Sequence, residues 1–240
     1  KDIVLDIVRH SSGLGIIDSL KVTGTAEETQ IAAIDQDKTV ILNAKLHKPE
    51  GDFVGEFGMG NLGFLNGVCN LYAKDGTSVD VVKTNRNGVD LPETLVFKDP
   101  DGNSDKYRLM SKEVIDTQIQ TVKFKGATWD VTVQPSVASI ARMKLMSAAH
   151  SEEPTFNVTT KDGNLVFSFG DASTHAGEFV FQHGVEGALQ HTWSWQVAQV
   201  QSILGLDGDL TMSISDQGAM QISIDSGMAK YDYILPAQSK

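Results

Sequence analysis

The stretch GAMQISIDSGMAKYDYILPAQSK, residues 218–240, predicts two β-strands joined by a tight turn. Within it, Asp225-Ser-Gly227 supplies residue types that accept the backbone angles of a short hairpin. The second strand ends in the apolar run Tyr233-Ile234-Leu235, which meets Pro236 close to the chain end. Chain ends are usually frayed and polar. An apolar strand closed by proline therefore indicates that this strand is sealed into the core, or that a partner docks on it.

Further short strands precede this hairpin. The runs 163–170, 177–182 and 209–215 are rich in β-formers or alternate between apolar and polar residues. They are separated by the turn signals KDGN (161–164) and SDQG (215–218), in which Asp-Gly and Gly supply the positive φ of tight hairpins. The sequence therefore predicts a mainly antiparallel β protein.

Four short amphipathic segments interrupt this pattern and predict helices that each pack one stripe on a sheet. They are residues 2–10, 61–72, 135–149 and 194–205. The first two starts are 61 − 2 = 59 residues apart and the last two are 194 − 135 = 59 apart, with a longer gap between. Because strand-rich sequence follows each helix, this spacing is an internal repeat in structural type.

Composition sets broad limits on the class of protein. The formal net charge is −11, which argues against a protein that grips nucleic acid over its whole surface. Residues 145–239 carry eleven acidic side chains against two lysines. No apolar run approaches the ~18 residues that span a bilayer. Cys69 is the single cysteine, so a reducing cytoplasm is the simplest location. The first residue is Lys1 rather than Met, so we expect residues upstream.

Two glycine- or aspartate-rich motifs have simpler interpretations than ligand binding. Gly58-Met-Gly60-Asn-Leu-Gly63 matches the dinucleotide pattern G-x-G-x-x-G, but no βαβ unit surrounds it, so we expect a tight turn into a helix with a close neighbour. The run 99–105, DPDGNSD, resembles a calcium loop, but its glycine is fourth and the twelfth position is Met110 instead of glutamate. We expect a polar turn there.

Three histidines recur at intervals of eight residues, His175, His183 and His191. With Glu178 or Glu186 they could hold zinc in a hydrolase, although this spacing is not a tight metal pattern. The chain has no G-x-S-x-G, P-loop or H-E-x-x-H motif, and Cys69 lies on the apolar side of its helix. We therefore expect no enzyme activity, no metal and no cofactor.

Taken in order, the elements resemble the DNA polymerase sliding clamps. The C-terminal order of helix TWSWQVAQVQSILG (192–205) and strands LTMSIS (210–215), AMQISID (219–225) and MAKYDYILPA (228–237) is similar to the end of a clamp subunit. The stretches KDIVLDIVRHSSGLGIIDSLKVTGTAEETQIAAIDQD (1–37) and GNLGFLNGVCNLYAKDGTSVDV (60–81) resemble the T-even-type bacteriophage branch. The resemblance covers nearly the whole chain and is weak across 85–130.

The resemblance implies an α+β fold with two similar clamp domains, each a pair of helix-plus-antiparallel-strands units. We expect an N-terminal domain at 1–111, an interdomain connector at 112–127 and a C-terminal domain at 128–240. In this branch three subunits close into a ring, a homotrimer, whose hole is lined by the helices. An acidic outer surface would then repel DNA and favour the duplex only inside the ring.

Side chains on the polar helix faces are the expected DNA-facing set. They are Arg9, Arg142, Lys144, Lys1, Lys74, Asn66, Asn70, Gln196 and Gln199, with Ser202 beside them. Few basic residues face the hole, because Asp2 and Asp6 share the face of Arg9. Arg142 and Lys144 are about 200° apart on a helix, so the pattern predicts that only one of them points inward.

By the same resemblance, the C-terminal strand and the connector form an apolar pocket that takes peptide tails of partners. Its expected residues are Tyr233, Ile234, Leu235 and Pro236, with Ile119, Val122 and Phe124 opposite. The implied function is a processivity clamp that encircles double-stranded DNA without sequence preference and tethers the replicative DNA polymerase. A clamp loader ATPase would open the ring, since the chain has no nucleotide site. Support for late viral transcription and a location in the cytoplasm of an infected bacterial host follow from the branch. The alternative is a β-rich virion structural or ligand-binding protein without DNA threading.

Overall fold

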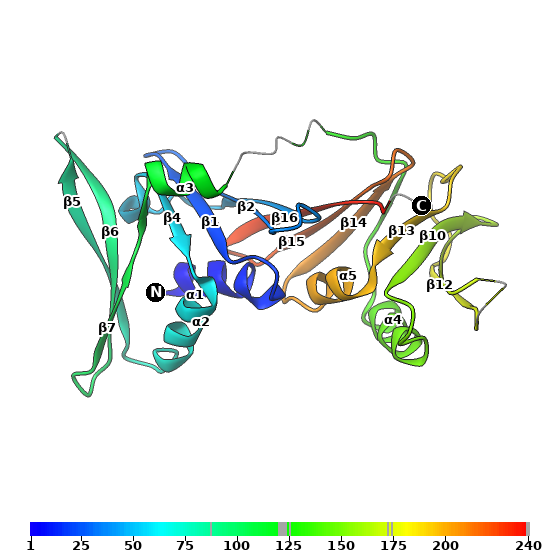
Figure 1. Ribbon diagram of the computed structural model, residues 1–240, viewed down its shortest axis with the longest axis horizontal. Helices are drawn as coiled ribbons and strands as arrows, with labels where there is room; N and C mark the ends of the chain where they lie inside the picture. The colour runs from blue at the N-terminus through cyan, green and yellow to red at the C-terminus, as the bar shows by residue number, and fades with distance from the viewer. Residues whose placement is uncertain (87, 120–123, 125, 172, 174, 239–240) are drawn as a thin grey trace. The chain divides into compact units, whose positions relative to one another are not determined.

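The computed structural model describes residues 1–86, 88–119, 124, 126–171, 173 and 175–238 (Figure 1). Its α+β chain divides into two compact units. Unit 1 is Lys1–Lys123 with Asp225–Tyr231, and unit 2 is Phe124–Ile224 with Asp232–Lys240. The turn of the C-terminal hairpin therefore belongs to the same unit as the N-terminal helix.

Unit 1 combines two sheets with three α-helices. One sheet has the hydrogen-bonded order β8-β4-β1-β2-β3, and the other has the order β5-β6-β7. The elements are α1 (Asp2–Arg9), η1 (Ser12–Leu14), β1 (Ser19–Gly24), β2 (Thr29–Ile34), β3 (Ile41–Leu46), η2 (Gly51–Phe53), β4 (Gly55–Gly60), α2 (Leu62–Leu71), β5 (Ser78–Arg86), β6 (Val89–Lys98), β7 (Ser104–Arg108), β8 (Met110–Ser111) and α3 (Lys112–Gln118).

Unit 2 repeats this plan with two helices. One sheet has the order β12-β11-β10-β13, and β16-β15-β14-β9 follow one another in the second. The elements are β9 (Val131–Val133), α4 (Val137–Ala149), β10 (Thr155–Lys161), β11 (Asn164–Phe169), β12 (Gly177–Gln182), β13 (Trp193–Gln196), α5 (Val197–Leu204), β14 (Asp209–Ser215), β15 (Ala219–Asp225) and β16 (Ala229–Pro236).

In each unit two helices pack side by side, α1 with α2 and α4 with α5 (Figure 1). Helix α1 buries Val4, Ile7 and Val8, one face at helical spacing. Strand β1 alternates between buried and half-buried residues, as a sheet covered on one side requires. The core of each unit therefore lies between a helix pair and the sheets.

The predicted hairpin turns form as expected. Asp162 and Gly163 have φ of 50° and 73° between β10 and β11, which is the conformation that Asp-Gly favours in a two-residue hairpin. Gly227 has φ of 83° in the turn between β15 and β16. These turn residues set the register of the strands on either side.

The structure confirms the four predicted helices and their even spacing. Helices α1 and α2 start 62 − 2 = 60 residues apart, and α4 and α5 start 197 − 137 = 60 apart. The predicted helix over 194–205 was wrong at its start. Gln196 ends strand β13, where it pairs with Thr155, because its backbone is extended (φ −69°, ψ 129°).

Helix α3 was not predicted. It buries Ile115, and Ile119 is buried one turn further on, after the helix has ended. A signal for it was present in the sequence, because Ser111 stands at the N-cap position and two isoleucines are spaced at i and i+4. Among the described residues, no helix is long and apolar enough to cross a membrane.

Candidate functional site

The helix pair of unit 1 turns a polar face outward. Arg9 on α1 and Asn70 on α2 are exposed, and Asn66 is half-buried. The glycines of α2, Gly63 and Gly67, also lie on this side, where an added Cβ would meet no atom within 4 Å. The predicted outward placement of Arg9, Asn66 and Asn70 is thus consistent with the structure.

Two lysines meet at the end of this helix pair. The ammonium of Lys1 donates to the backbone oxygen of Lys74 at 2.8 Å and to Thr77 Oγ1 at 3.0 Å. It therefore ties the start of α1 to the loop that follows α2. Lys74 itself is exposed. Of the two, Lys74 has the more accessible charge.

The helix pair of unit 2 presents both of its basic residues. Arg142 and Lys144 are exposed on either side of Met143, which is completely buried. The amide nitrogen of Gln201 on α5 donates to Ser147 Oγ on α4 and joins the two helices. Both side chains are exposed because they flank the buried face of α4, and which of them faces the hole of a ring stays a prediction.

The other residues of unit 2 that were predicted to face DNA lie on α5 or directly before it. Gln199 and Ser202 are half-buried on α5, whereas Gln196 belongs to β13.

The helices also carry exposed apolar side chains, and the sequence analysis did not predict this exposure. Val137 on α4 is 86% exposed, and Leu145 on α4 and Leu71 on α2 are also largely exposed. Since an apolar side chain on a helix is ordinarily assigned to the core, the pattern alone gives no signal for them. The outward helix faces are therefore mixed in character and only weakly basic.

The last part of strand β16, from Asp232 onward, is held firmly within unit 2. Tyr233 and Leu235 are completely buried, Ile234 is nearly so, and Pro236 is exposed. The indole N–H of Trp195 donates to the backbone oxygen of Leu235 at 3.1 Å. The apolar run is thus sealed into the core, which was one of the two expected explanations.

The residues predicted opposite this strand have separate surroundings. Ile119 is buried in unit 1, and Phe124 stacks on Trp129 in unit 2 at a ring-centroid distance of 6.1 Å. Val122 lies outside the described residues. The partner pocket therefore stays a prediction.

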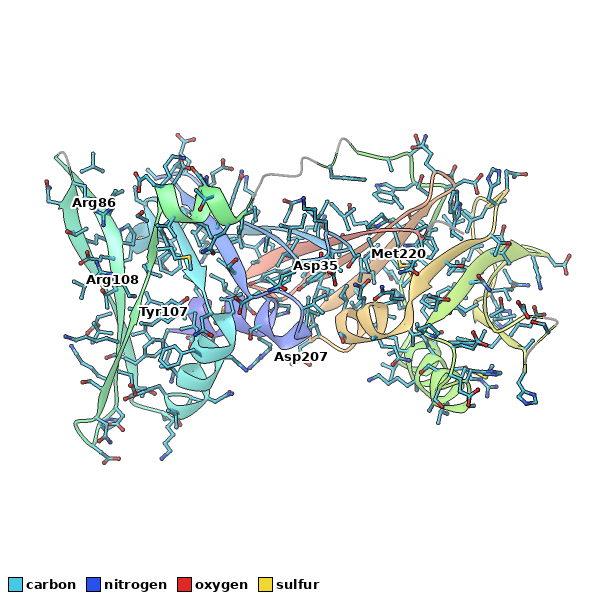
Figure 2. The ribbon with its side chains drawn as sticks, viewed as in Figure 1. Asp35, Arg86, Tyr107, Arg108, Asp207 and Met220 are labelled. Carbon is cyan, nitrogen blue, oxygen red and sulfur yellow. The ribbon has the colours of Figure 1, made fainter. Side chains whose placement is uncertain are left out.

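Strand β7 in unit 1 and strand β12 in unit 2 each stand at the end of a sheet, as do β5, β8, β9 and β13 among the described residues. Figure 2 shows Tyr107 and Arg108 on β7. Tyr107 is buried, its hydroxyl donates to the backbone oxygen of Gly60 at 2.5 Å, and its ring stacks on Phe64. Arg108 is exposed, as are Glu178 and Val180 on β12. Unpaired strand edges of this kind are templates for pairing with another chain.

A buried polar cluster in unit 1 was not predicted. Asp6 on α1 accepts hydrogen bonds from Tyr231 Oη and Ser226 Oγ, both at 2.8 Å. His10 Nδ1 lies 3.3 Å from the Asp6 carboxylate and 2.9 Å from its backbone oxygen. Burial raises the pKa of Asp6, but the hydrogen bonds from His10, Tyr231 and Ser226 outweigh it and hold the pKa below its ordinary value. Only the i, i+4 spacing of Asp6 and His10 hinted at this cluster.

The glycine motif has a packing role. Gly58 and Gly60 lie in β4, which pairs antiparallel with β1 and β8, so the βαβ context of a dinucleotide site is absent there. A Cβ on Gly58 would lie 2.7 Å from Ile115, and one on Gly60 would lie 2.0 Å from Met110. The close neighbour of these two strand glycines is therefore the β8–α3 segment, whereas the expected close neighbour of the helix glycine Gly63 was wrong, because nothing lies within 4 Å of its added Cβ.

The other two motifs are also structural. Asp99 Oδ1 accepts from the backbone N–H groups of Asp101 and Asn103, which makes the run 99–105 a self-capped turn between β6 and β7. Among the described residues, no group of three histidine, cysteine or acidic side chains could hold a metal ion. His191 instead pairs with Asp216 at 2.8 Å. Burial raises the pKa of Cys69 to about 11, as expected of a core thiol.

Comparison with known proteins decides the fold. The structure of A. fulgidus PCNA with the C-terminal region of FEN-1 matches with a TM-score of 0.73 at 11% sequence identity, over 100% of this chain and 96% of that chain. The chain has the sliding-clamp fold. A PCNA of Thermococcus kodakaraensis matches with a TM-score of 0.72 at 11% identity, over 99% and 96% of the two chains. Proliferating Cellular Nuclear Antigen of Entamoeba histolytica matches with 0.69 at 12% identity, over 98% and 94%.

This clamp fold is visible in the structure and not in the sequence comparisons. A scan against protein-family models found no match, and neither did a search of the curated proteins. The repeated plan of helix pairs and antiparallel sheets in the two units is the feature that the clamp fold explains.

Proposed function

We propose that the chain is a non-enzymatic sliding clamp, copies of which close into a ring around double-stranded DNA. The observation that carries this proposal is the match to PCNA structures over the full length of both chains. A ring around a duplex cannot leave sideways, so it holds its position by threading and needs no tight grip. The weakly basic helix faces suit that mode of holding, because each neutralised phosphate would steepen the salt dependence by about 0.9 log units and slow sliding.

The DNA-facing set follows from the helix faces. We assign the direct electrostatic contacts to Arg9, Arg142 and Lys74, which are exposed, and we keep Lys144 in the set as the less direct contact, because it lies about 200° from Arg142 on α4. Lys1, Asn66, Asn70, Gln196 and Gln199 are the remaining residues of the set. The net charge of −11 belongs mainly to the rest of the surface, so DNA is favoured only inside the ring.

The ring is a homotrimer in this proposal, closed through two of the edge strands. Strand β7 of one copy adds to β12 of the next copy, so that each sheet continues across the subunit contact. Exposed Lys106 on β7 and exposed Glu178 on β12 give the two edges opposite charges. Residues 1–111 and 128–240 form the two clamp domains, and 112–127 connect them.

Partners bind outside the hole. We propose that the replicative DNA polymerase inserts a peptide tail beside the C-terminal strand, where Pro236 is accessible, and that a clamp loader ATPase opens the ring. The resemblance to the T-even-type phage branch extends the proposal to late viral transcription in the cytoplasm of an infected bacterial host. The structure of A. fulgidus PCNA with the C-terminal region of FEN-1 is a complex of such a fold with a partner peptide.

The mass of the assembly in solution tests the ring. We expect light scattering to give about three times the 26.0 kDa of one chain. Val180→Asp on β12 should shift the protein toward monomer, because a buried, unpaired charge at a strand contact is costly. Val82→Asp is the matched control, since Val82 is similarly exposed on β5, outside the proposed contact. A wild-type monomer at micromolar concentration contradicts the proposal, and a trimer insensitive to Val180→Asp moves the contact elsewhere.

A further inference from the structure

The two units carry histidines at equivalent places. His10 follows α1 and His150 follows α4, each as the C-cap residue and each followed by serine. His47 follows β3 and His183 follows β12, the end strands of the β1-β2-β3 and β10-β11-β12 series. The internal repeat therefore places His10 and His150 at equivalent helix ends, one corner of each unit, whereas His183 lies beside Asn164, at the opposite end of β12 from His150.

In unit 1 this corner is filled by the C-terminal hairpin turn, Asp225–Tyr231. The ring of His10 stacks on Tyr231 with centroids 4.3 Å apart and planes 11° apart. The backbone N–H of His47 donates to the backbone oxygen of Met228, and His47 Nε2 lies 2.7 Å from Asp225 Oδ1. Both histidines of the corner thus contact one acidic hairpin turn.

In unit 2 the equivalent corner is open. A hollow of about 620 Å³ lies at the end of α4, lined by Ala149, His150, Ser151, Glu152, Glu153, Ser173 and His175. The ring of His150 stacks on Phe169, with ring centroids 5.6 Å apart. The hollow is therefore the counterpart of the place that the hairpin turn occupies in unit 1.

The counterpart of that turn is the β6–β7 turn of unit 1. Each turn joins two neighbouring strands that follow the second helix of a helix pair. Strands β6 and β7 follow α2, and strands β15 and β16 follow α5. Tyr107 on β7 and Tyr233 on β16 are both buried, and we align the two strands at these residues. In this alignment Asp105 of β7 corresponds to Tyr231 of β16, because each lies two residues before the aligned tyrosine.

We propose that the β6–β7 turn of one copy docks into the α4 hollow of the next copy, with Asp105 facing His150. The inference rests on the proposed ring, in which β7 and β12 of neighbouring copies pair. It gives a role to two motifs that the fold alone leaves unused, the acidic run 99–105 and the histidines of unit 2. The partner of this surface is a second copy of the chain, because the β6–β7 turn is the counterpart of the turn that fills the corresponding place in unit 1.

This contact strengthens as the pH falls. Imidazoles take up a proton between about pH 5 and 8, whereas aspartates stay ionised above about pH 4. Around the hollow, Glu152 and Glu153 repel an acidic turn while the histidines are neutral. Asp171 adds a third carboxylate, because it accepts hydrogen bonds from Ser173 of the lining, and the Glu178–Lys161 pair and Arg142 on α4 are further charges of unit 2.

On the turn, the hydroxyl of Tyr72 donates to Asp105 Oδ2 at 2.9 Å, and Asp99 is a second carboxylate that acts on this hydroxyl. Burial raises the pKa of Tyr72 to about 12, so its hydroxyl stays neutral between pH 6 and 8. The sign of the pH effect therefore comes from the imidazoles of the hollow, because a protonated imidazole attracts an acidic turn.

The trimer–monomer equilibrium at pH 6.0 and pH 8.0 tests this inference. For wild type, sedimentation equilibrium should give a dissociation constant per interface about fivefold lower at pH 6.0, the upper end for one partly exposed ion pair. His150→Asn and Asp105→Asn should each remove most of that difference. His191→Asn is the control, because His191 is exposed in unit 2 and pairs with Asp216 outside the hollow.

A fixed charge makes the test sharper. His150→Lys should keep the trimer as tight at pH 8.0 as wild type is at pH 6.0. A trimer whose stability does not change with pH, or a pH effect that survives His150→Asn, overturns the docking and leaves the ring intact. A monomer at both pH values overturns the ring itself, and the docking with it.

Discussion

The hydroxyl of Tyr231 offers the most direct test of how the hairpin turn is held in unit 1. It donates to Asp6 Oδ2 at 2.8 Å, while the ring stacks on His10. Tyr231→Phe removes the hydrogen bond and keeps the stack. A hydrogen bond to a charged group contributes about 1.5–3 kcal/mol, so we expect the free energy of unfolding to fall by about 2 kcal/mol.

The pH dependence of this loss has a definite sign. Since hydrogen bonds hold the pKa of Asp6 below its ordinary value of 3.8, its ionised form stabilises the folded state at neutral pH. That contribution is fully present above the unfolded pKa and is lost as the pH falls through the lower folded pKa. The difference between wild type and Tyr231→Phe should therefore be constant from pH 5 to 8 and shrink below about pH 4.

Urea denaturation with two probes measures the effect. All three tryptophans, Trp129, Trp193 and Trp195, belong to unit 2, so fluorescence follows that unit while far-UV circular dichroism follows both. Tyr231→Phe should lower the midpoint seen by circular dichroism more than the midpoint seen by fluorescence. Lys98→Met is the control, since its exposed pair with Asp80 is worth at most about 0.5 kcal/mol. A loss below that amount for Tyr231→Phe refutes the reasoning.

Three further outcomes follow from the structure. Gly24→Ala should destabilise the chain by about 3 kcal/mol in thermal denaturation, because its Cβ would lie 1.9 Å from the Phe53 backbone oxygen; Gly63→Ala, in open space on α2, should stabilise it by about 0.5–1 kcal/mol. Arg9→Glu with Arg142→Glu should shorten loader-dependent primer extension without changing the mass of the assembly, and an unchanged length removes both from the DNA-facing set. Cys69 should react with a thiol reagent at pH 8 only in denaturant, because burial raises its pKa to about 11; rapid labelling of the folded protein would contradict its burial.

The helices and C-terminal strands could be predicted because their signals are local. Val4, Ile7 and Val8 repeat at helical spacing, and Asp162-Gly163 specifies its own turn conformation. Each pattern depends on neighbours within a few residues, so it survives without knowledge of the fold.

The contacts that hold distant segments together could not be predicted. Asp6 and Tyr231 lie 225 residues apart, and no local pattern indicates that their side chains meet. The exposure of Val137 and Leu145 could not be predicted either, because it depends on which face of α4 the sheet covers. Gln196 was assigned to a helix because polar and apolar residues alternate there in a way that fits both structures.

Retention on DNA of different topology tests the central claim most directly. The protein is loaded onto nicked circular duplex by a loader and passed through a gel-filtration column at a salt concentration that abolishes simple phosphate binding. We expect it to co-elute with the circle and to be lost once a restriction enzyme cuts the circle into a linear duplex. Equal retention on circular and linear DNA, or no retention on either, would show that the chain does not encircle the duplex.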